Sequence, residues 1–187
     1  MKIKLIKFHK VKSTNDVAMR LIKQNTSKPT LVLSKNQING RGRIGKKWIS
    51  KSGNLFISIF FRLDEININF KQFSVLNALL FKKLISEKIS KKIMIKWPND
   101  LLYKKKKFCG ILQEIIKYRD YSYLIVGIGI NTNSFPENKS FQSTSLKNII
   151  DKKVDNEKFL KNILLAYEKF LSQAKKKTFL ELKRKYK

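Results

Sequence analysis

The glycine- and arginine-rich segment Gly40–Gly45, which reads GRGRIG, constrains the fold more than any other part of the chain. Its glycines let the backbone approach a ligand closely, and its N–H groups and two guanidinium groups suit phosphate or carboxylate oxygens. The next apolar segment, residues 55–61, is strand-like, whereas a dinucleotide-binding G-x-G-x-x-G loop opens a helix. Gly45 is not followed directly by the Lys-Ser/Thr pair of a P-loop, and no kinase catalytic motif lies downstream. The loop therefore predicts a site for an oxygen-rich anion on a fold outside the three familiar phosphate-loop families.

The charge balance is strongly basic: 42 Lys and Arg face 13 Asp and Glu, a formal net charge of +29 over 187 residues. Six of the basic residues are arginine, and the lysines are scattered along the whole chain. Dedicated nucleic-acid surfaces concentrate basic residues on one face, with aromatic residues between them. We therefore interpret the charge as a solvated lysine coat with weak, salt-sensitive affinity for polyanions, and expect no specific nucleic-acid partner.

The single cysteine and the single histidine limit the kinds of catalytic and metal site that the chain can form. Cys109 excludes an intramolecular disulfide and a multi-cysteine metal site, and its apolar neighbours predict that it is buried. His9 lies in a strand-like run with no acid or nucleophile beside it, so we expect no catalytic role and no metal ligands. The N-terminal residues lack the apolar core of a signal peptide, and no run is long enough to span a membrane. These features predict a cytoplasmic protein without a membrane partner.

Hydrophobic periodicity predicts strands before and between helices. Strands are expected at residues 3–8, 30–34, 55–61, 93–97, 101–104, 108–118 and 121–131, and helices at 17–24, 70–88 and from 155 to the end. The apolar strand 55–61 should be central and covered on both faces. The polar segment 132–143 is expected to be a mobile loop. The pattern indicates an α+β domain with a mixed, mainly antiparallel sheet flanked by helices.

Gly127 and Gly129 stand two residues apart in a predicted strand, so they share one face. Glycine weakens a strand interior, and a pair of glycines indicates that something lies flat against the sheet there. That layer is either a ligand or a closely packed helix. Asn131 would stand at the end of the same strand, beside the same space.

Two further segments are unusual. The string Lys96-Trp97-Pro98-Asn99-Asp100 predicts a tight turn after a strand, although a turn alone explains Pro-Asn-Asp. Lys107 ends a run of four lysines, most of which should be solvated. It differs from the others because it begins the next strand, where alternation could turn it inward.

In one chain and in this order, the motifs resemble the catalytic domain of biotin–protein ligases (biotin–[acetyl-CoA-carboxylase] ligases) over residues 12–146. The motifs are Ser13-Thr14-Asn15, Gln37-x-x-Gly40-Arg41-Gly42-Arg43-x-Gly45-x-x-Trp48, Lys96-Trp97-Pro98-Asn99-Asp100, Lys107-x-x-Gly110-Ile111-Leu112 and Gly127-x-Gly129-Ile130-Asn131. The resemblance implies the class II aminoacyl-tRNA synthetase/biotin ligase catalytic fold. It also implies that ATP with Mg²⁺ converts biotin to biotinyl-5′-AMP, which then biotinylates a specific lysine on the biotin carboxyl carrier domain of a biotin-dependent carboxylase.

The resemblance also implies roles for individual residues. Lys107 and Arg43 are the catalytic candidates, with Lys107 bridging the biotin carboxylate and the α-phosphate. The candidate biotin-binding residues are Ser13, Thr14, Asn15, Gln37, Gly40, Arg41, Gly42, Arg43, Lys107, Gly110, Gly127 and Gly129. The candidate nucleotide-binding residues are Arg43, Trp48, Lys96, Asn99, Asp100 and Asn131.

Twelve residues precede Ser13, so we expect one catalytic domain over residues 1–187, without the DNA-binding domain of repressor-type members and without a C-terminal β-barrel. This organisation predicts a monofunctional ligase, and leaves a homodimer open. One alternative is a lipoate or octanoate–protein ligase of the same fold, which would carry a different anion loop. The other is a basic, non-enzymatic nucleic-acid-binding module, which explains the charge but not the paired glycines.

Overall fold

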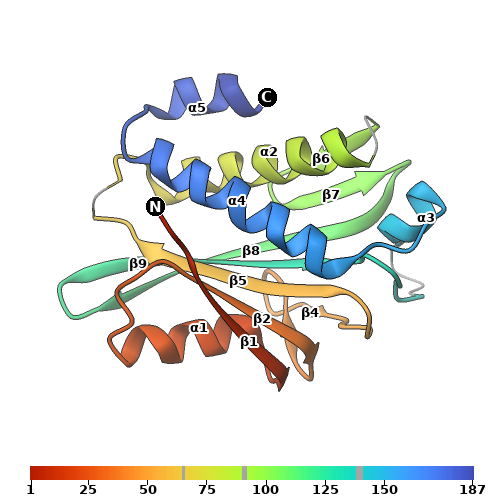
Figure 1. Cartoon of the computed structure of the whole chain (residues 1–187), viewed down its shortest axis with the longest axis horizontal. Helices are drawn as coiled ribbons and strands as arrows, with labels where there is room; N and C mark the ends of the chain where they lie inside the picture. Colours follow the sequence, from red (N-terminus) through yellow and green to blue (C-terminus); the bar gives the residue numbers. More distant parts are fainter. Residues whose placement is uncertain (65, 90–91, 138–140) are drawn as a thin grey trace.

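A seven-stranded mixed sheet organises the computed structural model, which describes residues 1–64, 66–89, 92–137 and 141–187 (Figure 1). β1 and β2 pair in parallel, and the other five neighbouring pairs are antiparallel, which confirms the predicted sheet type. In spatial order the strands are β1 (Lys4–Val11), β2 (Thr30–Gln37), β5 (Leu55–Arg62), β9 (Tyr121–Ile130), β8 (Lys106–Tyr118), β7 (Asp100–Tyr103) and β6 (Ile93–Lys96). A separate ribbon pairs β3 (Gly40–Arg41) with β4 (Lys47–Trp48).

Helices cover the two faces of the sheet unequally. On one face lie α2 (Phe70–Lys88) and α4 (Asn156–Ala174), with α5 (Phe179–Tyr186) beyond them, whereas α1 (Thr14–Lys23) lies on the opposite face (Figure 1). The short helix α3 (Leu146–Ile150) lies between β9 and α4 in the chain. Because α1 is ten residues long, it covers only part of its face. The remainder of that face is available for a site.

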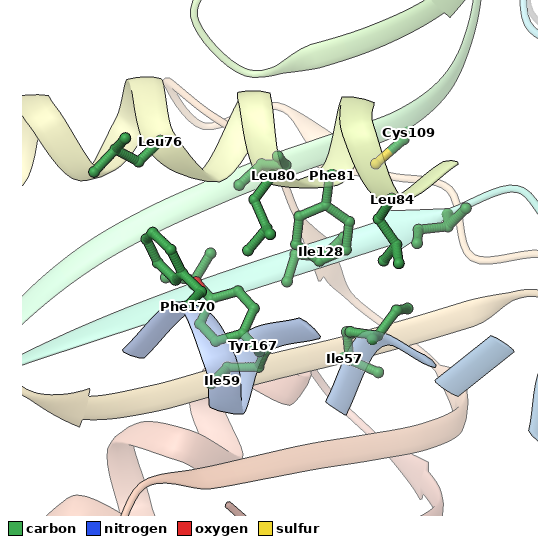
Figure 2. Packing of buried hydrophobic residues seen from close by; sticks show 14 of the residues in the cluster. Ile57, Ile59, Leu76, Leu80, Phe81, Leu84, Cys109, Ile128, Tyr167 and Phe170 are labelled. Carbon is green, nitrogen blue, oxygen red and sulfur yellow. The ribbon is translucent and has the colours of Figure 1, made fainter. Parts of the chain in front are cut away.

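The larger core fills the space between the sheet and the helices α2 and α4. β5 contributes Ile57 and Ile59, β9 contributes Ile128, and Cys109 of β8 is fully buried among them (Figure 2). Burial raises the pKa of the Cys109 thiol, so it remains a neutral filler, as its sequence context predicts. On the α1 face, Phe60 and Ile125 join a second, smaller apolar cluster. β5 is therefore central and covered on both faces, as predicted.

Three hydrogen-bonded polar side chains cross the larger core. The hydroxyl of Tyr167 donates to Oδ1 of Asn77 at 2.5 Å, and Nδ2 of Asn77 donates to Oε1 of Gln113 at 2.7 Å. Tyr167 and Asn77 are fully buried, and burial raises the pKa of the Tyr167 phenol, which therefore stays protonated as a donor. These hydrogen-bonded side chains link α4 through α2 to β8, the strand that also carries site residues.

Local caps explain where the helices begin and end. α2 has the predicted bounds and starts with a reciprocal cap between Asn69 and Gln72. α1 begins three residues before the predicted start because Ser13 caps it through the backbone N–H of Asn15. The predicted single C-terminal helix is wrong: the chain breaks after α4, and Thr178 caps a new helix, α5.

The remaining differences concern short elements and chain ends. α3 was not predicted, since five residues are too few to display a helical period. β2 continues to Gln37 because the parallel pairing with β1 extends to Val11. Of the segment predicted to be mobile, residues 138–140 lie outside the described residues. Among the described residues, no helix is both long enough and apolar enough to cross a bilayer.

Replacing Tyr167 by Phe is expected to lower the free energy of unfolding by about 1–3 kcal/mol, because the buried Oδ1 of Asn77 loses its donor. Urea denaturation followed by circular dichroism measures the change. Tyr103→Phe on β7 is the matched control, since that ring is only partly buried. Equal stability of Tyr167→Phe and the wild type would contradict the structural role of the hydrogen bond between Tyr167 and Asn77.

Candidate active site

Three glycines leave part of the α1 face of the sheet without side chains. Gly110 of β8 pairs directly with Gly129 of β9, and Gly127 pairs with Ser58 of β5. A Cβ atom built at Gly129 would stand 2.3 Å from Cε2 of Trp48, and one at Gly110 would stand 2.7 Å from its Cζ3. The indole of Trp48 therefore lies directly on bare backbone, which only glycine permits at this distance.

Gly127 has a different neighbour. A Cβ atom there would stand 2.2 Å from Oδ1 of Asn15, which belongs to α1. Of the two interpretations that the sequence left open, helix packing thus accounts for Gly127. At Gly129 the layer against the sheet is the side chain of Trp48 from the β3–β4 ribbon, which the sequence did not indicate.

A cavity of about 1080 Å³ opens above this floor. It is bounded by the start of α1, the β3–β4 ribbon, the β6–β7 turn, the start of β8 and the end of β9. The predicted site residues that line it are Ser13, Thr14, Asn15, Gln37, Arg41, Gly42, Arg43, Trp48, Lys96, Asn99, Asp100, Lys107, Gly110, Gly127, Gly129 and Asn131. Segments far apart in the sequence thus converge on one space.

Gly40 is the predicted site residue that does not line this cavity. It borders a second hollow of about 510 Å³, together with Glu114 and the outer side of the loop. A Cβ atom at Gly40 would stand 2.6 Å from the carbonyl oxygen of Trp48, its partner in the ribbon. Close pairing of β3 with β4 is therefore sufficient reason for a glycine at position 40.

Uncharged polar groups form one end of the cavity. The backbone N–H and the hydroxyl of Thr14 donate to Oε1 of Gln37 at 2.8 and 3.1 Å, and Nε2 of Gln37 donates to Oγ of Ser50 at 3.1 Å. Oγ of the fully buried Ser58 lies 2.7 Å from Oγ1 of Thr14 and also contacts Oδ1 of Asn15. Sequence reasoning missed Ser58, although a lone hydroxyl within an apolar central strand was an available signal.

Lys107 occupies the middle of the cavity wall. Its Nζ lies 2.8 Å from Oδ1 of Asp100 and 5.3 Å from the centroid of the Trp48 ring. Its backbone is held on both sides, since its N–H donates to Gln142 and its carbonyl accepts from Thr144. Lys105 from the same run also lines the cavity, whereas Lys106 is exposed and does not.

A β-bulge explains how Lys107 reaches this face. Leu101 pairs with Cys109, but Leu102 pairs with Lys107, so the register shifts by one residue between the two pairs. Without the bulge, residues 107 and 110 would point to opposite faces of the sheet. With the bulge, a Cβ atom at Gly110 would stand 3.3 Å from Nζ of Lys107.

The two loop arginines have different surroundings. Nη2 of Arg41 lies 2.8 Å from Oε2 of Glu114 and 3.1 Å from Oδ1 of Asp16. Arg43 is exposed at the cavity mouth, where its Nη1 donates to Oδ1 of Asn99 at 3.1 Å. Glu114 was not predicted, although strand alternation places it on the same face as Gly110.

At the far end of the cavity, two buried polar atoms have no hydrogen-bond partner among the described residues. Nδ2 of Asn131 donates to the carbonyl of Thr144 at 3.2 Å, whereas its buried Oδ1 accepts no bond from the described residues. Nε1 of Trp48 is likewise buried without an acceptor in the described part of the chain. Unpaired buried groups that line a cavity are available to a bound molecule. In the same ranges, no group of three or more His, Cys, Asp and Glu side chains could hold a metal ion.

The chain belongs to the biotin/lipoate A/B protein ligase family, whose model matches residues 7–131. The bifunctional ligase/repressor BirA of Bacillus subtilis is 36% identical over 84% of this chain and 50% of that protein. A biotin–[acetyl-CoA-carboxylase] ligase of Paracoccus denitrificans is 28% identical over 86% of this chain and 70% of its own length. The chain spans about half the length of the BirA proteins of Bacillus that it matches.

Comparison with solved structures identifies the same family. The biotin protein ligase of Aquifex aeolicus in complex with biotin and ATP superposes with a TM-score of 0.83 and 34% sequence identity, covering 98% of this chain and 76% of that one. The α+β fold that the sequence predicts is therefore the fold of biotin protein ligases.

Gly129→Ala is expected to push the indole of Trp48 off the floor, because the new methyl group and the ring cannot occupy the same space. In a Trp97→Phe background, quenching of the remaining tryptophan fluorescence by acrylamide should increase. Ser122→Ala, on the same strand but away from the cavity, is the control. Unchanged quenching in Gly129→Ala would show that Trp48 does not lie on β9.

Proposed function

We propose that this chain is an ATP-dependent biotin–protein ligase that forms biotinyl-5′-AMP and transfers the biotinyl group to a lysine of a carrier domain. One observation carries the proposal: a single cavity of this family's fold brings together a glycine floor on which Trp48 lies, an uncharged polar end and a lysine at mid-length. The relatives named as ligases, and the neighbour that holds biotin and ATP, support the same chemistry.

The central lysine addresses the main electrostatic obstacle. A carboxylate must approach the α-phosphate of ATP, and the two anions repel each other across a partly desolvated site. About a quarter of the Lys107 side chain is exposed, and its ammonium group pairs with the carboxylate of Asp100. A cation already held in place stabilises the approaching anions without reorganising at the moment of reaction. Arg43 at the mouth supplies a second cation for the phosphates.

The reaction then proceeds in two steps within one cavity. In the first, a carboxylate oxygen of biotin bonds to the α-phosphorus of MgATP, and the bond to pyrophosphate breaks. In the second, the uncharged amine of the carrier lysine attacks the carbonyl carbon of the mixed anhydride, AMP leaves and the amine loses a proton. In this proposal, Lys107 stabilises the negative charge that develops in both steps.

The two ends of the cavity differ in the way that the proposed ligands require. Thr14, Gln37 and Asn15 present uncharged hydrogen-bonding groups, which suit the neutral ureido ring of biotin. Asn99 and Asn131 line the other end, where the unpaired Oδ1 of Asn131 offers an acceptor to the nucleotide. Mg²⁺ enters as part of MgATP, and the use of ATP suits a protein of the cytoplasm.

The direct test uses the full chain with biotin, MgATP and a biotin carboxyl carrier domain. Mass spectrometry of the carrier is expected to show one added biotinyl group on one lysine. Parallel reactions with lipoate and octanoate examine the related chemistry of the family. Transfer of lipoate or octanoate in place of biotin would contradict the proposal, as would the absence of any acyl transfer.

Lys107→Ala is expected to reduce biotin-dependent exchange of pyrophosphate into ATP by about 100-fold to 1,000-fold, the usual effect of removing a preorganised charged donor. Lys106→Ala removes the same charge from an exposed neighbour outside the cavity and should retain wild-type exchange. Equal rates for the two variants would remove Lys107 from the reaction.

A further inference from the structure

The carboxylate of Glu114 joins three elements beside Asn15, near the end of the cavity that Thr14 and Gln37 line. Oε2 of Glu114, on β8, accepts from Nη2 of Arg41 at 2.8 Å and from Nδ2 of Asn15 at 2.6 Å. The same atom thus contacts the β3–β4 ribbon and helix α1. About a quarter of the Glu114 side chain is exposed (24%), so these charge-assisted hydrogen bonds form where water competes weakly.

The bond to Glu114 also fixes the orientation of Asn15. Because Nδ2 of Asn15 donates to Glu114, its Oδ1 is directed toward Ser58 and lies over the backbone of Gly127. A carboxylate can only accept, so it specifies which end of the amide faces it. Glu114 therefore determines which polar atom Asn15 presents to the floor of the cavity.

The pairing of Arg41 also separates the roles of the two loop arginines. Arg41 is held by Glu114 and by Asp16, whose side chain is about half exposed. Its charge is therefore paired with two carboxylates beside α1. Arg43 pairs with a neutral amide, so its charge remains available at the mouth.

We propose that Glu114 is a positioning residue: its carboxylate clamps Arg41 and Asn15 together, and so holds the β3–β4 ribbon closed over the biotin-ring end of the cavity. The role deepens the proposed function, because it assigns the binding of biotin to a preorganised loop. Arg41 acts as the anchor of that loop, and Arg43 as its anion-facing cation.

The experiment compares Glu114→Gln with the wild type by two readouts. In the ligand-free protein, hydrogen exchange of the backbone amides of residues 40–48 should accelerate about tenfold, because hydrogen bonds to a charged group are lost. In pyrophosphate exchange, the KM for biotin should rise about tenfold while kcat changes less than about twofold, as expected when a binding contribution is removed.

Matched variants separate positioning from general damage. Glu114→Asp keeps a carboxylate acceptor, so its KM for biotin should lie between those of the wild type and Glu114→Gln. Asp120→Asn, in the β8–β9 turn, removes the same charge outside the cavity and should behave as the wild type. Arg41→Gln should accelerate loop exchange as Glu114→Gln does. The acceleration in the double variant should be smaller than the product of the two single accelerations, because each single variant already removes the pair between Arg41 and Glu114.

The outcomes distinguish this inference from the proposed function. Absence of pyrophosphate exchange in the wild type would refute the ligase activity, yet faster loop exchange in Glu114→Gln would still support the clamp. Wild-type loop exchange in Glu114→Gln would overturn the clamp, even in an active ligase. A fall in kcat with an unchanged KM would also overturn it, since it would place Glu114 in the chemical step.

Discussion

The geometry of the site depends on the β-bulge in the β7–β8 pair. Strand alternation would direct Lys107 and Gly110 to opposite faces, and the shift in register brings both to the face that α1 leaves open. An ammonium group therefore stands beside the glycine floor on which Trp48 lies. The backbone bonds that hold Lys107 to the segment after β9 keep it there. Position and charge are both set before any ligand arrives, as electrostatic catalysis requires.

Acidic residues organise the cations around the cavity. The chain has 13 acidic residues among its 187, yet Asp16, Asp100 and Glu114 each pair with a cation that lines this space. Isolated surface ion pairs contribute little to stability, so we ascribe these pairs to the placement of specific side chains. The other lysines are spread along the whole sequence, and their interpretation as a solvated coat stays a prediction.

Sequence reasoning identified the elements and most of the residues that gather at the cavity, because periodicity and motif spacing are local properties. α2 has its predicted bounds, and β5 is central because its apolar run continues on both faces. The bulge, by contrast, depends on pairing between strands, which no single strand reveals. Trp48 on Gly129 and Glu114 beside Asn15 are contacts between distant segments, so their geometry appears only in the folded chain.

We propose that one cavity holds biotin and nucleotide with their reacting groups at Lys107. A crystal structure of the chain with a non-hydrolysable analogue of biotinyl-5′-AMP tests this proposal. We expect the bicyclic ring beside Thr14 and Asn15, the adenosine near Asn99 and Asn131, and the acyl–phosphate linkage within hydrogen-bond reach of Nζ of Lys107. A linkage bound away from Lys107, or an analogue bound outside the cavity, would contradict it.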